Sequence, residues 1–228
     1  MKLPNLSFIV TAAGESTRFI STEPKQFLKI NKIPIYIFSL LSIKKIQKKS
    51  EVFLTINKKI KKEKIQKELN SYNLKNIRIV YGGSNRAESV QKAFKEIKIK
   101  KGLVVIHDSV RPNFDFTILN KVIEESKNFH GIIVAAKIQD TVKKIQKTFV
   151  AKTIKRDNLW LAETPQIFKY SVLKKCYANK KKLKPYTDES QLLEQNGYKI
   201  KFYENLEYNN KITTKKDMAV YKKLLIDV

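Results

Sequence analysis

The chain has 228 residues, of which 42% are hydrophobic and 10% aromatic, so it can bury a sizeable core and fold as one large domain. A disordered chain and a membrane-spanning protein are both disfavoured, because no apolar run approaches the roughly 20 residues that cross a bilayer. Residues 1–7 lack the apolar segment of a signal peptide, and Cys176 is the sole cysteine. We therefore expect a cytoplasmic protein with no disulfide, no thiolate metal cluster and no membrane partner.

The net charge of +26, from 47 Lys and Arg against 21 Asp and Glu, indicates anionic partners. Nucleic acid, an anionic membrane and small phosphorylated substrates are the alternatives. Lysines recur along the whole chain instead of forming a basic tail, and no RNA-reading aromatic motif accompanies them. We interpret most of this charge as solvated surface. A basic nucleic-acid-binding protein remains only a remote alternative.

Short hydrophobic runs rich in β-branched residues alternate along the chain with segments whose apolar residues repeat at helical spacing. Strands are predicted at residues 8–10, 51–56, 77–81, 103–106, 131–136 and 199–203. Helices are predicted over residues 33–43 and into the lysines that follow, at 58–72, 86–97, 116–129 and 170–179, from an opening at Thr187-Asp188, and from residue 214. This alternation predicts a single α/β domain over residues 1–228, with a doubly wound, mostly parallel sheet covered on both faces.

Residues at about 138–161 interrupt this alternation. Their hydrophobic residues are interspersed with Lys, Gln, Thr and Asp and show no helical spacing. We interpret the segment as an extended β-hairpin arm that projects from the sheet, and such an arm commonly mediates dimerisation.

The first predicted strand leads into a loop of small residues, Ala12-Ala13-Gly14, which is followed by Arg18 and Lys25. Small residues allow a ligand to approach the backbone amides closely, and the two cations can neutralise phosphates. The loop therefore indicates a polyphosphate site. The alternative is an ordinary strand-to-helix turn with solvated charges.

Three other distinctive segments follow predicted strands: residues 82–89, residues 107–112 and Asp140-Thr141. In open α/β sheets, ligands bind outside the carboxyl ends of the strands, so we expect these segments to converge on one site. Gly83 offers free backbone N–H groups, with hydroxyls from Ser84 and Ser89. An ordinary glycine turn with a helix N-cap is an equal alternative.

Asp108 directly follows a buried strand and can hold Mg²⁺, directly or through water, or a sugar hydroxyl. The alternative is a structural ion pair between Asp108 and Arg111. His107 is interpreted as a neighbour whose hydrogen bonds are satisfied. The sequence has no Gly-x-Gly-x-x-Gly, Gly-Lys-Ser/Thr or His-Glu-x-x-His motif and no nucleophile triad, so any chemistry relies on positioning and charge neutralisation.

A set of ordered motifs carries a family resemblance: Ala12-Ala-Gly-x-x-x-Arg18, Pro24-Lys-Gln-Phe-Leu28, Gly82-Gly-x-x-Arg-x-x-Ser-Val90, His107-Asp-x-x-Arg-Pro112, Asp140-Thr141, Thr164-Pro-Gln-x-Phe168, Thr187-Asp188 and Lys211-Ile-Thr213. From about residue 8 to about residue 220 the chain resembles the 2-C-methyl-D-erythritol 4-phosphate cytidylyltransferases of the non-mevalonate isoprenoid pathway. The resemblance implies a Rossmann-like nucleotidyltransferase that joins CTP and 2-C-methyl-D-erythritol 4-phosphate, with Mg²⁺ or another divalent cation. It also implies a homodimer formed through the arm.

The resemblance assigns roles to named residues. Catalytic roles fall to Arg18, Lys25, Arg156 and Lys211. Nucleotide binding falls to Ala12, Ala13, Gly14, Gly83, Ser84, Arg86, Ser89, Asp108 and Ser109, and Asp108 is the expected metal ligand, directly or through water. Binding of the second substrate falls to Asp108, Arg111, Thr141, Arg156, Thr164 and Lys211. Because the arm crosses to a partner in this family, we expect Arg156 and Thr164 to serve the other subunit's site.

Four residues depart from the family pattern, among them Phe19 in place of the usual Met and Asn210 in place of the usual Ile. Ser16 stands where the loop usually carries a second glycine, which predicts a stiffer loop. Glu163 replaces the usual Gln and is expected to place a negative charge near an anionic substrate.

The alternative within the same class is a polyol-phosphate cytidylyltransferase such as the ribitol 5-phosphate enzyme, which shares the CTP motifs. The run Leu159-Trp-Leu-Ala162 and the spacing Thr153-x-x-Arg156 favour the methylerythritol enzyme by resemblance.

Overall fold

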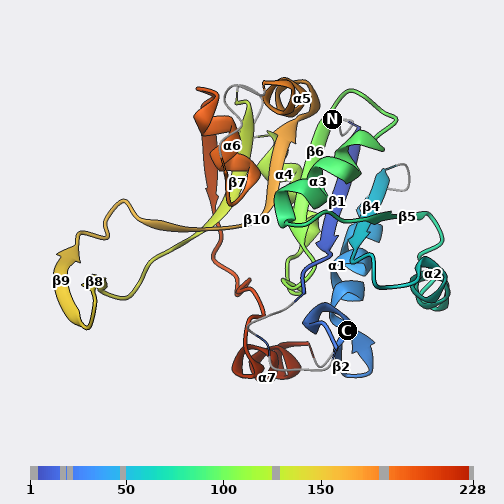
Figure 1. The fold of residues 1–228 in the computed structure, drawn as a ribbon, viewed down its shortest axis with the longest axis horizontal. Helices are drawn as coiled ribbons and strands as arrows, with labels where there is room; N and C mark the ends of the chain where they lie inside the picture. Colours follow the sequence, from blue (N-terminus) through green and yellow to red (C-terminus); the bar gives the residue numbers. More distant parts are fainter. Residues whose placement is uncertain are drawn as a thin grey trace.

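A computed structural model describes residues 5–15, 19, 23–46, 50–124, 129–179 and 185–225, and a seven-stranded sheet runs through its centre (Figure 1). The strand order is β11 (Ile200–Glu204), β7 (Gly131–Lys137), β10 (Trp160–Lys169), β6 (Leu103–Asp108), β1 (Leu6–Ala12), β4 (Glu51–Ile56) and β5 (Ile77–Tyr81). Strand β10 is antiparallel to both of its neighbours, and the other pairings of this sheet are parallel. The predicted mostly parallel sheet is confirmed, although β10 was not among the predicted strands.

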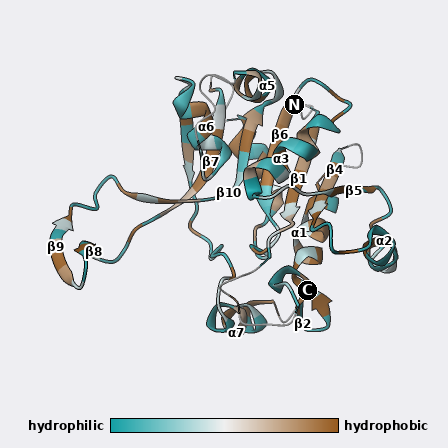
Figure 2. Cartoon of the chain, viewed as in Figure 1, coloured by the Kyte–Doolittle hydropathy of each residue, from teal (hydrophilic) through white to brown (hydrophobic). Residues whose placement is uncertain are grey.

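Helices cover both faces of the sheet because the central strands are apolar on both sides. Along β1, Phe8 and Val10 pack on one face with α1 (Ile35–Lys44), α2 (Lys62–Ser71) and α4 (Leu119–Glu124). Ile9 packs on the other face with α3 (Arg86–Lys95), α5 (Tyr170–Ala178) and α6 (Glu189–Gln195). These β1 side chains are 0% exposed, and burial of each contributes about 1.5–3 kcal/mol. Figure 2 shows the hydrophobic central strands and the hydrophilic surface of α2.

Side-chain caps fix where three helices begin. Asn85 accepts a hydrogen bond from the Glu88 amide at the start of α3, and Asp188 accepts one from the Gln191 amide at the start of α6. Thr214 forms a capping box with Asp217 at the start of α7 (Lys215–Leu224). This start agrees with the last helix predicted from residue 214. The predicted helix that opens at Thr187-Asp188 is confirmed as α6, with Asp188 as its N-cap.

Some predicted boundaries differ from the structure. The predicted helix at 116–129 is a 3-10 turn at Phe116–Ile118 followed by α4, and residues 125–128 lie outside the described part of the chain. A small hairpin of β2 (Lys29–Ile30) and β3 (Ile33–Pro34) precedes α1. Its turn places Asn31 and Lys32 at φ of 49° and 68°, a conformation that joins short antiparallel strands. The turn contains no glycine, so the sequence carries no signal for it.

The predicted arm is a hairpin of β8 (Val142–Gln146) and β9 (Phe149–Ile154) that extends well beyond the sheet (Figure 1). It is slightly shorter than expected, because residues 160 and 161 already belong to β10. Phe149 is 77% exposed, and Ile145 and Val150 are exposed beside it. In the described residues, no helix combines the length and apolar character of a membrane span.

Candidate active site

A cavity of about 390 Å³ opens at the carboxyl ends of β1 and β6 and at the start of α3. Every residue predicted to bind nucleotide lines it, together with Lys25 and Lys211; the lining residues are Thr11, Ala12, Ala13, Gly14, Glu15, Lys25, Gln26, Asn57, Gly83, Ser84, Asn85, Arg86, Ser89, Asp108, Ser109, Val110 and Lys211. The expected convergence of the segments after β1, β5 and β6 is thus confirmed. Arg18 and Ser16 lie outside the described residues.

The loop after β1 is shaped by a buried glutamine that the sequence analysis quoted but gave no role. The Gln26 amide donates hydrogen bonds to the carbonyls of Ala12 and Gly14, both at 2.8 Å. An added Cβ at Gly14 would meet no atom within 4 Å, so open space adjoins the backbone there. Lys25 precedes Gln26 in a 3-10 turn, which brings its side chain to the same cavity.

The glycine loop after β5 is closely packed. An added Cβ at Gly83 would lie 2.3 Å from the Glu88 side chain, and one at Gly82 would lie 2.5 Å from the Ala13 side chain, so both positions require glycine. The expectation of free N–H groups is wrong for this conformation. The Gly83 amide donates to Ser89 Oγ at 3.0 Å, and the Ser84 amide donates to Glu88 at 2.7 Å.

Glu88 was not predicted as part of the site. It accepts hydrogen bonds from both the amide and the hydroxyl of Ser84, and these lower the pKa of its carboxyl to about 2. Two predictions for this loop therefore hold together. Its residues line the cavity, as predicted for a nucleotide-binding loop, and the loop also ends in a helix N-cap at Asn85, as the alternative interpretation expected.

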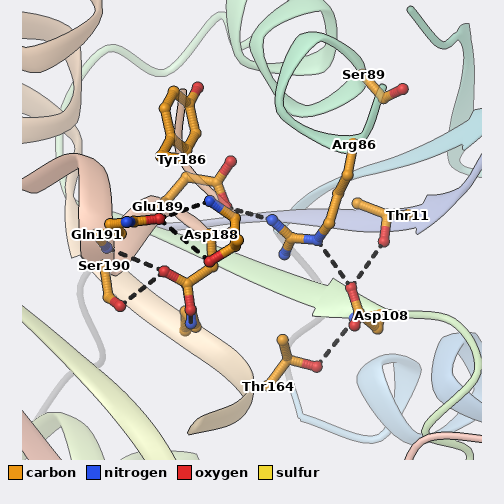
Figure 3. A network of polar contacts seen from close by, with 12 residues as sticks. Thr11, Arg86, Ser89, Asp108, Thr164, Tyr186, Asp188, Glu189, Ser190 and Gln191 are labelled. Atoms are coloured by element: carbon orange, nitrogen blue, oxygen red, sulfur yellow. Dashed lines mark hydrogen bonds and ion pairs between the residues drawn. The ribbon is translucent and has the colours of Figure 1, made fainter. Parts of the chain in front are cut away.

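Asp108 is the centre of a polar network that joins four parts of the chain (Figure 3). Its Oδ1 accepts hydrogen bonds from Thr11 Oγ1 and Arg86 Nε, both at 3.1 Å, and its Oδ2 lies 2.8 Å from Lys211 Nζ. Burial disfavours the charged carboxylate, but the charges of Arg86 and Lys211 outweigh it and hold the pKa of Asp108 well below its usual range. The alternative Asp108–Arg111 ion pair is absent.

Arg111 pairs instead with Glu163, at 3.3 Å, and donates a hydrogen bond to the Asn209 carbonyl at 2.6 Å. Glu163 is buried and also accepts hydrogen bonds from the amides of Asn205 and Asn209. The expected negative charge of Glu163 is therefore balanced by Arg111, and neither side chain lines the cavity. The role of Arg111 in substrate binding remains a prediction.

His107 and Thr164 form a buried hydrogen-bonded chain behind Asp108. His107 Nε2 lies 3.1 Å from the Arg111 carbonyl, which can only accept, so Nε2 carries the proton. Nδ1 then accepts from the Thr164 hydroxyl at 3.2 Å, and Thr164 Oγ1 accepts from the Asp108 amide at 3.0 Å. Burial lowers the pKa of His107 to about 4, so the neutral imidazole is retained. The prediction that His107 is a satisfied neighbour is confirmed.

Comparisons with known proteins agree with this geometry. The family model described as "IspD: 2-C-methyl-D-erythritol 4-phosphate cytidylyltransferase" matches residues 6–226. The chain belongs to this family.

Relatives in the IspD family cover nearly the whole chain. The 2-C-methyl-D-erythritol 4-phosphate cytidylyltransferase of Wigglesworthia glossinidia brevipalpis is 38% identical over 218 residues, which are 94% of this chain and 93% of that protein. That of Clostridioides difficile strain 630 is 32% identical and covers 96% and 93%. The "Bifunctional enzyme IspD/IspF" of Pelagibacter ubique strain HTCC1062 is 39% identical, and the match covers 94% of this chain but only 56% of that longer protein.

Solved IspD structures share the fold. The 4-diphosphocytidyl-2C-methyl-D-erythritol synthase of Anaerococcus prevotii DSM 20548 superimposes with a TM-score of 0.82 at 29% identity, over 97% of this chain and 98% of that one. The IspD structure from Francisella tularensis gives a TM-score of 0.79 at 31% identity, over 97% and 100%.

The predicted substrate-side residues of this IspD family member fall into two groups. Asp108, Lys211 and Thr164 lie together at the carboxyl end of β6. Thr141 and Arg156 lie at the base of the arm, exposed and outside the cavity lining, where Arg156 donates a hydrogen bond to the Gln139 carbonyl. Thr164 was expected to serve the other subunit's site together with Arg156. This placement is wrong, since Thr164 lies in β10 of the central sheet and contacts Asp108 of its own chain.

Glu189 is the other residue that the sequence analysis missed. It follows the quoted Thr187-Asp188 pair, is 0% exposed, and its Oε2 lies 2.7 Å from Arg86 Nη1. Burial raises the pKa of Glu189 despite the opposing charge of Arg86. Its adjacency to a recognised motif was the one available signal, because its partner is more than one hundred positions away in the chain.

The carboxylates of the site suit a metal bound largely by its substrate. The described residues contain no cluster of three or more His, Cys, Asp or Glu that could hold a metal ion. Asp108 and Glu15 line the cavity, and Glu15 is paired with Lys59 at 3.0 Å. Mg²⁺ is commonly held by one or two carboxylates together with phosphates and water, so Asp108 fits such an ion.

Proposed function

We propose that this chain is a CTP-dependent cytidylyltransferase. It joins CTP and 2-C-methyl-D-erythritol 4-phosphate to give 4-diphosphocytidyl-2-C-methyl-D-erythritol and pyrophosphate, in isoprenoid precursor biosynthesis. The observation that carries this function is the family match over residues 6–226, whose nucleotide-side motifs converge on one cavity.

The reaction needs charge neutralisation more than a protein nucleophile. A phosphate oxygen of the second substrate attacks the α-phosphorus of CTP in line, a new P–O bond forms, and the bond to pyrophosphate breaks. Both reactants are anions, so their mutual repulsion and their alignment form the main barrier. Lys25 and Lys211 line the cavity, and a fixed cation of this kind contributes roughly 3–4 kcal/mol to transition-state stabilisation. Arg18 is assigned the same task as Lys25 by the family motif.

We assign the two sides of the cavity to the two substrates. The loop at Ala12, Ala13 and Gly14 has open space beside its backbone, which suits the triphosphate. The glycine loop with Ser84 and Ser89 is closed by its own hydrogen bonds and suits the base and ribose. The second substrate then lies beside Asp108 and Lys211, and Thr164 supports Asp108 from behind.

We propose Mg²⁺ or another divalent cation as the cofactor, with Asp108 as its protein ligand, directly or through water. When bound, the ion neutralises charge on the phosphates. Both Asp108 oxygens already accept hydrogen bonds, which favours contact through water.

We also propose a homodimer in which the arm carries Thr141 and Arg156 to the partner's cavity. The length of the arm and its exposed hydrophobic residues support this assembly (Figure 1). We expect a cytoplasmic location, in keeping with the single cysteine and the need for CTP.

The deciding experiment is pyrophosphate release with CTP and Mg²⁺, with 2-C-methyl-D-erythritol 4-phosphate and ribitol 5-phosphate tested side by side. Turnover is expected with the first acceptor alone. Turnover with ribitol 5-phosphate alone would move the protein to another polyol-phosphate class, and no turnover with either acceptor would contradict the proposed function.

A further inference from the structure

The guanidinium of Arg86 bridges two carboxylates that come from different elements (Figure 3). Its Nε lies 3.1 Å from Asp108 at the end of β6, and its Nη1 lies 2.7 Å from Glu189 in the first turn of α6. Arg86 itself begins α3. One side chain thus ties three elements together at the inner wall of the cavity.

Glu189 is held firmly on the far side of this bridge. The preceding residue, Asp188, accepts hydrogen bonds from the Gln191 amide at 2.9 Å and from Gln166 of β10 at 2.8 Å, which anchors the start of α6 to the sheet. Glu189 is completely buried, and a buried carboxylate is tolerated only with a partner. Its partner is Arg86.

The bridge sets the charge balance around the reacting groups. Arg86 and Lys211 together balance Asp108 and Glu189. If Glu189 were neutral, Arg86 would keep Asp108 as its one remaining carboxylate partner among the described residues. The guanidinium would then be free to turn toward the cavity that it lines and to attract the nucleotide phosphates.

We propose that Glu189 is a positioning residue for the transfer reaction. It fixes Arg86 against Oδ1 of Asp108, so that Oδ2 stays directed at Lys211, and it keeps the Arg86 charge from pairing with the nucleotide. This inference rests on the proposed function, because it concerns the step in which Asp108 and Lys211 meet the second substrate.

The first test is Glu189→Gln, which keeps the shape of the side chain and removes its charge. We expect kcat with 2-C-methyl-D-erythritol 4-phosphate to fall about tenfold. CTP should bind no more weakly than to the wild type, as measured by calorimetry, because the released Arg86 charge attracts its phosphates. The matched control is Glu51→Gln, which removes a 2.9 Å ion pair with Arg78 at the amino end of β4, away from the cavity. The control is expected to retain wild-type kcat.

The second test is a double-mutant cycle with Arg86→Lys, since a lysine cannot bridge both carboxylates. In that background, Glu189→Gln should lower kcat by less than about twofold, because the route through the guanidinium is already lost. Full additivity would show that Glu189 merely stabilises α6 and would overturn the proposal. Equal losses of kcat and CTP affinity in the single variant would overturn it as well.

Glu189→Asp provides a further variant in case the glutamine variant does not fold. It retains the charge on a shorter side chain, so we expect a loss of kcat smaller than about tenfold with unchanged CTP affinity; wild-type kcat would contradict the proposal. The two hypotheses fail differently. A wild-type protein without turnover contradicts the proposed function, whereas an active wild type with an unaffected Glu189→Gln variant contradicts this inference alone.

Discussion

Asp108 remains ionised in a nearly closed environment because two cations reach it from distant parts of the chain. Arg86 is supplied by α3 and Lys211 by the segment before α7, and each contacts a different carboxylate oxygen. The fold thereby places a negative charge between the two expected substrate positions without leaving it unbalanced. A carboxylate held in this way can orient a hydrated cation or a hydroxyl group while its pKa stays low.

Lys25 is the described cation that the proposed mechanism depends on most directly. Lys25→Ala should lower kcat by roughly 10²-fold, because it removes a positive charge from the cavity in which the phosphates gain charge in the transition state. Steady-state pyrophosphate release measures the effect, and circular dichroism checks the fold. Lys29→Ala changes an exposed lysine outside the cavity and should retain turnover within about twofold. Wild-type turnover of Lys25→Ala would remove this residue from the mechanism.

Cys176 provides a prediction about pH. It is 0% exposed in α5, and burial raises the pKa of its thiol to about 11. The unfolded thiol has a pKa of about 8.5, so this group favours the folded state fully below that pH and progressively less as the pH rises toward 11. At pH 8, iodoacetamide should modify the native protein far more slowly than the urea-unfolded protein, as measured by mass spectrometry. Comparable rates would show that the thiol is accessible and ionised.

The arm is a two-stranded hairpin that is separate from the central sheet. Strands β8 and β9 pair with each other but with no strand of the central sheet, and Ile145, Phe149 and Val150 stay exposed. An isolated two-stranded ribbon is marginally stable in water, so the arm calls for a partner surface. Its base also carries two residues assigned to the second substrate.

Arg156→Ala should separate the two substrates of the reaction. We expect kcat/KM for 2-C-methyl-D-erythritol 4-phosphate to fall at least about tenfold with CTP affinity unchanged, because Arg156 is assigned to the second substrate and not to the nucleotide. Kinetics and calorimetry with CTP provide the comparison. Lys155→Ala, an exposed neighbour on the arm, is the control for lost charge. Equal losses for both substrates would mean that Arg156 is wrongly placed.

At the scale of the whole molecule, the active assembly is expected to be larger than one chain. The arm and α2 lie at opposite ends of the molecule (Figure 1), so contacts made by the arm itself do not reach α2 of the same chain. The diffuse positive charge on such surfaces also raises the local concentration of anionic substrates, an effect that weakens with salt.

Phe149→Asp should convert a dimer into monomers, because it places a charge on the most exposed aromatic residue of the arm. Analytical ultracentrifugation should give twice the chain mass of 26.6 kDa for the wild type and the chain mass for the variant. Lys67→Asp, on the exposed face of α2, makes a larger charge change away from the arm and should remain dimeric. A monomeric wild type, or a dimeric Phe149→Asp variant, would contradict assembly through the arm.

The sequence by itself determined the parallel core and the nucleotide side of the cavity. Runs such as Phe8-Ile9-Val10 are apolar on both faces and can only be buried between two layers of helices, and the loops after such strands must meet at one edge of the sheet. The close packing at Gly82 and Gly83, by contrast, became visible only in the structure, where Ala13 and the Glu88 side chain leave no room for a Cβ.

The tertiary structure alone decided which charges are paired and where β10 runs. Strand β10 contains Pro165 and a register shift between Ala162 and Gln166, so its local pattern does not resemble a central strand. The partners of Arg86 and Glu163 come from elements far away in the sequence. Local patterns record propensity and burial, whereas the pairing of buried charges depends on which elements pack side by side, and only the assembled fold settles that.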